Sequence, residues 1–141
     1  MNPIKATMAL ALVLGATQFL AAGAAQAQTA LTGAQIQALL TTNYACGTSG
    51  TEKWDEKLIG GTAGNVTDYK KGPTDPIDPT AVVGTYTIDT GNNTITYSYT
   101  GGGVYTYTVT TAGATAAGSP GNYTFANSGT YLISVQAVPC P

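Results

Sequence analysis

The chain has 141 residues, of which five are lysine or arginine and seven are acidic, so its net charge is -2, and it contains no histidine. This low positive charge argues against a nucleic-acid partner, because binding phosphates requires clustered Lys and Arg, and it offers no polybasic patch to anionic lipids. The absence of histidine removes the most common general acid and base from any catalytic scheme.

Residues 1–27 are predicted to be a secretory signal peptide. Lys5 precedes an uncharged apolar stretch, and the small residues of Ala25-Gln26-Ala27 follow it, which is the order of features in export signals. A retained membrane anchor is the alternative, but the stretch is diluted by Ala, Gly, Thr and Gln, whereas a spanning helix needs about 20 strongly apolar residues. We therefore expect cleavage after Ala27 and one secreted or periplasmic domain, residues 28–141, without a stable membrane span.

The mature domain is predicted to begin with a short helix over residues 31–40. Thr32 and Gln35 have the spacing of a capping box, and Leu31 with Ile36 has that of a hydrophobic staple. Ile36 also starts an apolar stripe at i, i+3 and i+4, which is typical of one helix face. Such a short helix needs a sheet to pack against.

Cys46 and Cys140 are the two cysteines of the chain, and they are predicted to form a disulfide because an even pair in a small exported domain is oxidised outside the cytoplasm. A metal site is the alternative, but two cysteines without a histidine are too few ligands. Asp75 and Asp78 carry oxygens that suit Ca²⁺, yet they lack the spacing of an EF-hand loop. We expect neither a metal nor another cofactor.

Two strands are predicted after the helix, from Trp54 to Ile59 and from Val66 to Tyr69, with the Gly-rich residues 60–64 between them. Residues 72–79 contain three prolines, which remove backbone donors and restrict the residues before them. That segment is predicted to be a stiff surface loop.

The most regular pattern runs from Val83 to Val109, where aromatic and branched residues alternate with Thr and Ser. A turn at Gly91-Asn92 and a three-residue loop at residues 101–103 predict two hairpins that share a strand. The expected pairs are Tyr86 with Tyr97, Thr87 with Thr96, Ile88 with Ile95, Tyr99 with Tyr105, Tyr97 with Tyr107 and Ile95 with Val109. A slip of one residue would mix the two faces, so the register is expected to separate a Tyr/Ile/Val face from a Thr/Ser face.

A final hairpin is predicted around the loop Asn127-Ser128-Gly129. It sets two apolar pairs opposite each other: Phe125 with Tyr131, and Tyr123 with Ile133. Gly129 is expected to adopt the left-handed conformation that such loops need. The last strand, residues 131–138, also has Leu132 and Val138 on its other side, so we expect it to be covered on both faces or to lie where the sheet closes.

Seven aromatic residues mark seven short strands at the spacing expected of a meander, barrel or sandwich: Trp54, Tyr69, Tyr86, Tyr97, Tyr107, Tyr123 and Tyr131. We predict a mainly β fold, a small antiparallel β-barrel or curled meander sheet of about seven strands. The short N-terminal helix is expected to plug or flank one end, and the Tyr face is expected to form the core.

A series of motifs occurs in a fixed order over most of the mature domain: the helix Leu31 to Leu40, Asn43-Tyr44-Ala45-Cys46-Gly47, Glu52-Lys53-Trp54, Asp68-Tyr69-Lys70, Val83-Gly84-Thr85-Tyr86 and Tyr105-Thr106-Tyr107. This order resembles that of small exported bacterial proteins of unknown function, in which a strand with GTW or GTY follows an N-terminal helix and a Gly-rich hairpin. The resemblance implies a fold, but it implies no activity and no functional residue.

No catalytic residue is assigned from the sequence. Ser and Thr nucleophiles lack an imidazole base, and neither Lys70 nor Lys71 stands in a motif that would replace it. A pair of carboxyl groups, as in glycosidases, is the remaining option, and the acids available for it are Asp55, Glu56, Asp68, Asp75 and Asp78. The first two lie beside lysines like a solvated strand edge, and the last two precede prolines like turn residues. A deep cleft that joins two of these acids would favour an enzyme.

The Thr/Ser face is a second candidate surface. Its threonines are Thr85, Thr87, Thr94, Thr96, Thr106 and Thr108. Regular Thr arrays on flat sheets are typical of ice-binding surfaces, but Thr is also common on the wet side of any sheet, and twist works against a flat lattice.

The sequence as a whole favours an uncharacterised exported binding or interaction domain that is not an enzyme, with a protein or glycan partner. Any exposed part of the Tyr face would suit a sugar ring or a partner surface. The alternative is a self-assembling extracellular surface or filament subunit, because low charge and paired Thr and Tyr rows suit edge-to-edge association. A glycan-acting enzyme and an ice-binding protein rank below both.

Overall fold

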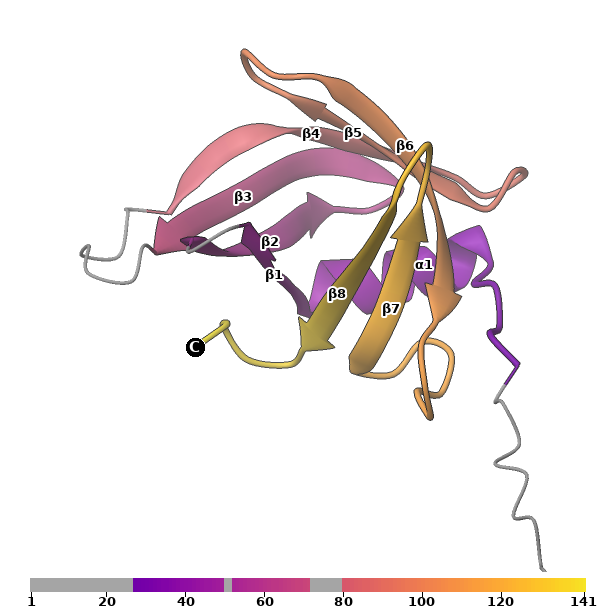
Figure 1. The fold of residues 1–141 in the computed structure, drawn as a ribbon. Helices are drawn as coiled ribbons and strands as arrows, with labels where there is room; N and C mark the ends of the chain where they lie inside the picture. Colours follow the sequence, from indigo (N-terminus) through magenta and orange to yellow (C-terminus); the bar gives the residue numbers. More distant parts are fainter. Residues whose placement is uncertain (1–26, 50–51, 72–79) are drawn as a thin grey trace, which may run out of the picture.

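The structure is a computed structural model that describes residues 27–49, 52–71 and 80–141 (Figure 1). In that part of the chain, one helix and eight strands follow in order: α1 (Gly33–Thr42), β1 (Tyr44–Ser49), β2 (Glu52–Gly60), β3 (Ala63–Lys71), β4 (Ala81–Asp89), β5 (Thr94–Tyr99), β6 (Val104–Thr111), β7 (Gly121–Ala126) and β8 (Thr130–Gln136). The predicted signal peptide, apart from Ala27, and the predicted proline loop lie outside the described residues.

The eight strands form a closed antiparallel β-barrel. Each strand pairs with the next along the chain, and β8 pairs back onto β1, where Ala45 lies opposite Val135. The predicted mainly β fold with an antiparallel barrel is confirmed, with eight strands in place of about seven. The additional strand is β1, whose small residues show no alternation between apolar and polar positions.

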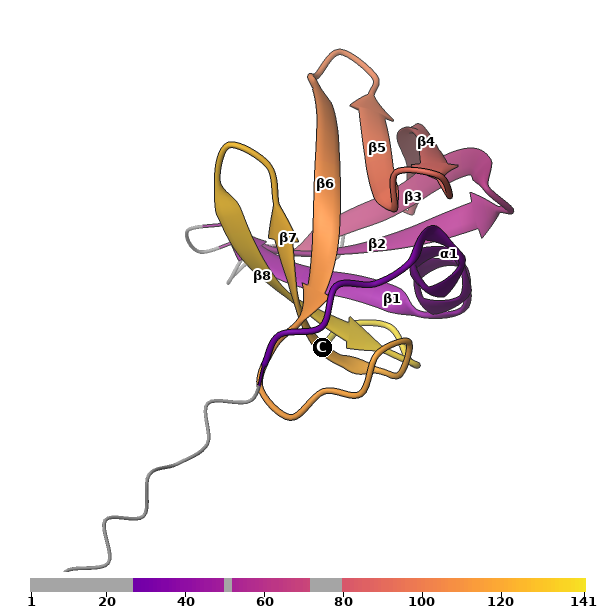
Figure 2. The same cartoon turned by 90° about the vertical axis from the view of Figure 1, so that its right-hand side faces the viewer.

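α1 covers one end of the barrel beside β1 and β2 (Figure 2). Its start has the predicted capping box, in which the Gln35 amide donates to Thr32 Oγ1 (3.3 Å) and the Thr32 amide donates to Gln35 Oε1 (2.8 Å). The Gly33 amide donates to Asn93 Oδ1 in the β4–β5 turn (2.8 Å), which fastens the helix to the barrel. The apolar stripe of the helix is buried, as predicted: Ile36, Leu39 and Leu40.

The residues before α1 extend the sheet along β6. Pairing between β5 and β6 stops at Thr94 and Thr108, and the last residues of β6 pair instead with residues 29–31. The Leu31 amide donates to the Val109 carbonyl (2.8 Å), and the Thr111 amide donates to the Thr29 carbonyl (2.9 Å). The N-terminal segment is therefore part of the barrel wall.

One hairpin of the predicted meander has the expected register and the other does not. β4 and β5 show the pairs Tyr86 with Tyr97, Thr87 with Thr96 and Ile88 with Ile95. The pairs predicted between β5 and β6 are wrong by two residues, since Tyr97 lies opposite Tyr105 and Ile95 lies opposite Tyr107. The turn is centred earlier than predicted, on Gly101, which takes a left-handed φ of 70°. A shift of two residues keeps each side chain on its predicted face.

The last hairpin has the predicted pairs of Phe125 with Tyr131 and Tyr123 with Ile133. Gly129 does not take the predicted left-handed φ, because the Asn127 side chain closes the loop by accepting a hydrogen bond from the Gly129 amide (2.8 Å). Leu132 and Val138 are 68% and 62% exposed, so the expectation that this strand is covered on both faces is wrong. Its pairing with β1 confirms the alternative, that it lies where the sheet closes.

The Tyr face is divided between a filled and an open half of the barrel. At the α1 end, Tyr86 and Tyr123 are buried among aliphatic residues, and their hydroxyls donate to the backbone carbonyls of Gly61 (2.8 Å) and Ser119 (2.5 Å). At the other end, Tyr105 is 43% exposed and Tyr131 is 50% exposed. The prediction that the Tyr face forms the core therefore holds for Tyr86, Tyr97 and Tyr123, which are buried, but not for Tyr105 and Tyr131 at the open end.

Candidate functional site

A cavity of about 550 Å³ opens at the end of the barrel that lies away from α1. The two ends of β5 show this. Asn93 directly precedes β5 and binds α1, whereas Thr100 directly follows β5 and lines the cavity. Six of the lining residues are aromatic: Trp54, Tyr97, Tyr99, Tyr107, Phe125 and Tyr131. Two are acidic, Glu56 and Asp68. We call the space bounded by these eight residues the barrel cavity.

The aromatic rings of the barrel cavity contact one another across neighbouring strands. Tyr107 is the centre of the group, with its ring centroid 6.0 Å from Tyr97, 5.9 Å from Phe125 and 5.9 Å from Tyr131, in each case edge to face. Tyr99 stacks on Tyr97 along β5 at 5.9 Å. Ring pairs in this range attract each other and restrict each other's rotation, so the wall that they form is largely preformed.

Trp54 reaches the barrel cavity by lying directly over Gly47 on β1, which is its partner in the β1–β2 register. A Cβ atom at Gly47 would overlap the indole ring. The absence of a side chain at Gly47 therefore sets the position of the ring at the cavity.

Gly47→Ala is expected to displace the Trp54 ring and to lower the free energy of unfolding by about 1–3 kcal/mol, the usual cost of overpacking. Urea denaturation measures the loss, and the emission maximum of Trp54, the only tryptophan, reports the ring. Gly61→Ala is the matched control, because a Cβ there meets only Gln37 Nε2 at 3.8 Å. Equal stability of the two variants would contradict this role of Gly47.

Glu56 and Asp68 form the acidic part of the barrel cavity. They lie opposite each other in the β2–β3 register, and both line the cavity. Tyr99 Oη donates a hydrogen bond of 2.5 Å to Glu56 Oε1. The pKa of Glu56 is raised from 4.5 to about 7: burial is the largest cause, the hydrogen bond from Tyr99 lowers it, and the charges of Asp68 and Asp55 add to the increase. Glu56 is therefore divided between its neutral and charged forms near neutral pH.

The Tyr99 hydroxyl keeps its proton in this arrangement. Burial raises the pKa of Tyr99, and the neighbouring Glu56 carboxylate raises it further, since a phenolate there would face a like charge. The Tyr99 hydroxyl can therefore donate to the Glu56 carboxylate, and this hydrogen bond fixes the orientation of one carboxyl oxygen.

The two acids lie on one wall of the barrel, with Trp54 beside them on β2, and Tyr107 and Phe125 lie on the opposite wall. β6 and β7 are four places around the eight-stranded barrel from β2 and β3, respectively, so Tyr107 and Phe125 lie across the cavity from the acids. Glycosidases place one carboxyl group on each side of the bond that they cleave. Glu56 and Asp68 share one side, and among the residues that the structure describes, those that line the opposite wall include no acid.

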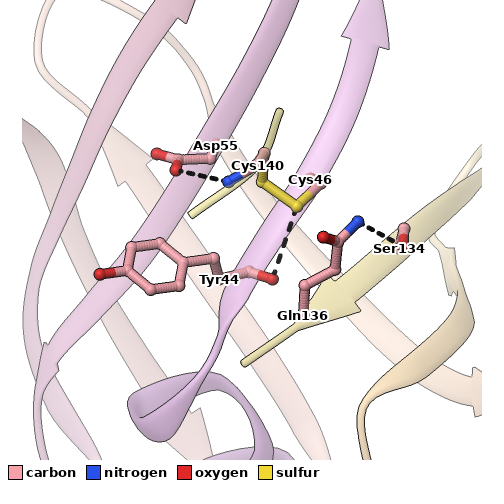
Figure 3. Close-up of a disulfide and its surroundings, with 6 residues drawn as sticks. All are labelled: Tyr44, Cys46, Asp55, Ser134, Gln136 and Cys140. Atoms are coloured by element: carbon pink, nitrogen blue, oxygen red, sulfur yellow. Dashed lines mark hydrogen bonds between the residues drawn. A yellow bond between two sulfur atoms is a disulfide. The ribbon is translucent and has the colours of Figure 1, made fainter. Parts of the chain in front are cut away.

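The five acids that the sequence offered for a catalytic pair have different positions. Glu56 and Asp68 are brought together in the barrel cavity. Asp55 belongs to the outer side of β2, where its Oδ2 accepts a hydrogen bond from the Cys140 amide (3.4 Å), as Figure 3 shows. Asp75 and Asp78 lie outside the described residues.

The predicted disulfide between Cys46 and Cys140 is present, with a Cα–Cα distance of 5.7 Å (Figure 3). It joins β1 to the segment that follows β8. Because β8 already pairs with β1, the bridge holds covalently the same part of the barrel at which the sheet closes.

The threonines of the predicted Thr face lie on the outside of β4, β5 and β6, away from the barrel cavity. Thr87 lies opposite Thr96, and Thr96 lies opposite Thr106, with 2.8 Å between the last two hydroxyl oxygens. Thr94 lies opposite Thr108. Thr85, Thr87, Thr106 and Thr108 are exposed, and Thr94 and Thr96 are half-buried. The row follows the curved surface of a barrel and is not a flat lattice.

The sequence interpretation missed the acidic wall, although a signal for it exists. Trp54, Glu56 and Leu58 alternate along one predicted strand, and a period of two places all three on the same face. The lysines beside Glu56 suggested a solvated edge, but they alternate to the outside: Lys57 Nζ lies 4.5 Å from the centroid of the Tyr44 ring.

Among the described residues, no helix combines the length and hydropathy that a membrane span requires, and no three potential metal-ligating side chains are grouped together. Comparison of the chain with protein-family models, with curated proteins and with solved structures gives no match in any of the three.

Proposed function

We propose that this chain is a binding domain that takes a small organic ligand into the barrel cavity and does not transform it. The observation that carries the proposal is the cavity itself. Its volume of about 550 Å³ lies within the range of about 300–1,000 Å³ that is usual for small-molecule sites. Such sites combine mostly apolar and aromatic walls with a few polar groups that orient the ligand, and six rings with two acids match that description.

The rim of the cavity supports the same function. Tyr105 stacks on Tyr107 with ring centroids 6.5 Å apart, so the aromatic surface continues from the inside of the barrel to its exposed edge. Tyr105 and Tyr131 are about half exposed there. Amphipathic rings that are wet at one end and packed at the other are common at binding sites, and they provide an entry surface for a ring-shaped ligand.

Val83 offers a direct test, because a register shift in the β3–β4 pairing leaves it out of the ladder and turns it to the cavity. We expect the purified protein to bind 1-aminoanthracene, a neutral fluorescent aromatic, and to show quenching of Trp54. Val83→Phe should weaken this binding at least about tenfold by filling the cavity. Val82→Phe is the matched control, since Val82 is 60% exposed. No saturable binding, or equal loss in both variants, would refute the proposal.

A glycan-acting enzyme is the second candidate, because two acids meet in one cavity. The same protein can be assayed for release of 4-nitrophenol from 4-nitrophenyl glycosides. Hydrolysis that Glu56→Gln abolishes would replace the binding function with a catalytic one. We favour binding, since the two acids lie on a single wall, whereas the reaction needs carboxyl groups on both sides of the glycosidic bond.

Two further parts of the proposal concern assembly and compartment. The pairing of β8 with β1 leaves none of the described strands with an unpaired edge along the seam, which argues against filament growth by strand addition. The disulfide supports a site of action outside the cytoplasm, where such bridges persist. We therefore propose a secreted or periplasmic binding domain that works as a single barrel.

A further inference from the structure

The hydroxyl of Tyr97 differs from the other buried hydroxyls of the Tyr face. Tyr86 and Tyr123 are buried, and each donates a hydrogen bond to a backbone carbonyl, while Tyr99 donates to Glu56. Tyr97 is only 3% exposed, yet in the part of the chain that the structure describes no group forms a hydrogen bond with its hydroxyl. Buried polar groups without a partner are rare in folded proteins, so this hydroxyl requires an explanation.

The position of Tyr97 places its hydroxyl at the inner end of the barrel cavity. Along β5, Ile95 is buried at the α1 end, Tyr97 follows and lines the cavity, and Thr100 lines it beyond the end of the strand. The Tyr97 ring is held between Tyr99, which stacks on it at 5.9 Å, and Tyr107, which meets it edge to face at 6.0 Å. Its oxygen is not among the fully enclosed polar atoms, so a ligand in the cavity can reach it.

The Tyr97 hydroxyl offers a proton to whatever binds there. Burial raises the pKa of Tyr97 well above its ordinary value, so the hydroxyl keeps its proton at physiological pH. A hydroxyl with its proton needs an acceptor atom on its partner. A ligand with such an atom completes the hydrogen bond, whereas a pure hydrocarbon leaves the donor buried and unpaired, which is unfavourable.

We propose that the ligand of the barrel cavity is a small aromatic compound with a neutral acceptor oxygen beside its ring, such as an aryl ketone, and that Tyr97 selects it by donating a hydrogen bond to that oxygen. This inference rests on the proposed binding function and assigns its ligand class. The ring of the ligand packs against Tyr107 and Phe125, which line the same cavity. The acceptor is neutral because the tyrosine hydroxyl and the rings around it are uncharged, and burying a charge among them is costly. A site that offers a hydrogen bond also rejects analogues without the matching group more strongly than an apolar pocket does.

Acetophenone and α-methylstyrene test the ligand class, because they have nearly the same shape and differ in one group: the ketone oxygen of the first is a CH₂ group in the second. Their affinities are measured by displacement of 1-aminoanthracene. Tyr97→Phe removes the hydroxyl and keeps the ring, so it should lower the affinity for acetophenone relative to α-methylstyrene about tenfold. Urea denaturation should show that this variant is as stable as the wild-type protein, since the lost hydroxyl has no partner within the described chain.

Tyr44→Phe is the matched control, because it removes a hydroxyl on the outside of the barrel, where Lys57 Nζ donates to it (3.4 Å). The ratio of the two affinities should be unchanged in this control. An unchanged ratio in Tyr97→Phe would overturn the assignment of the ligand class and leave the binding function intact. The same holds if 1-aminoanthracene binds but acetophenone does not displace it. Failure of 1-aminoanthracene to bind the wild-type protein would overturn both.

Discussion

Replacing both Cys46 and Cys140 with serine is expected to lower the free energy of unfolding by about 4 to 5 kcal/mol, which is the chain-entropy value for a loop of this order. The two cysteines are 94 residues apart, so the bridge restricts nearly all of the unfolded domain. For a small domain with a total stability of about 5–15 kcal/mol, this loss is a large fraction.

Urea denaturation followed by Trp54 fluorescence measures the effect as a shift of the midpoint. The wild-type protein in dithiothreitol should unfold like the double variant, because both lack the covalent link. The Cys140 amide also donates to Asp55 Oδ2 (3.4 Å). Asp55→Asn keeps the disulfide and an acceptor oxygen at this position, so its midpoint distinguishes the effect of the bridge from the effect of the groups around it. A double variant with an unchanged midpoint would show that pairing of β1 with β8 alone holds the seam.

Glu56→Gln is expected to stabilise the protein at pH 8 by up to about 3 kcal/mol, because each unit of a pKa shift corresponds to about 1.4 kcal/mol. The pKa of Glu56 is about 7 in the folded chain against 4.5 for an ordinary Glu, so the folded state binds the proton more tightly. The stability that the protonated Glu56 side chain contributes is fully present below pH 4.5 and is lost as the pH increases to 7. The glutamine side chain of the variant stays neutral at every pH and still accepts the hydrogen bond from Tyr99.

The measurement is the free energy of unfolding at intervals between pH 5 and pH 8. The wild-type value should decrease across this range, and the value for Glu56→Gln should be nearly constant. Asp89→Asn serves as the control, because hydrogen bonds from Asn92 and Gly91 lower the pKa of Asp89 and place its effect below pH 4. A wild-type profile without this decrease would mean that Glu56 is better solvated than its burial indicates.

The alternating segments of the sequence predicted most of the barrel wall. Between Val83 and Val109, each side chain lies on its predicted face even where the register is shifted by two residues, because the period of two survives such a shift. The shift itself depends on which glycine of residues 101–103 takes the left-handed φ. Three adjacent glycines are equivalent in that respect, so the sequence does not distinguish the two turns.

β1 and the cavity could not be predicted in the same way. Tyr44 to Ser49 is recognised as a strand only through its partners β2 and β8, and pairing of the first strand with the last is not encoded in a local pattern. The presence of a cavity depends on the distance between opposite walls of the barrel. Alternation predicts which side chains point inward, but it does not predict whether side chains from opposite walls fill the space between them.

The position of the disulfide also determines how the domain bears a mechanical load. Tension applied between residue 27 and Pro141 passes from Cys46 through the sulfur bridge to Cys140, so it bypasses the loop that contains β2 to β8. The segment under tension is residues 27–46: the pairing of residues 29–31 with β6, then α1, then the start of β1 up to Cys46. Once that pairing breaks, further pulling peels away the helix end, and β2 to β8 stay outside the loaded path.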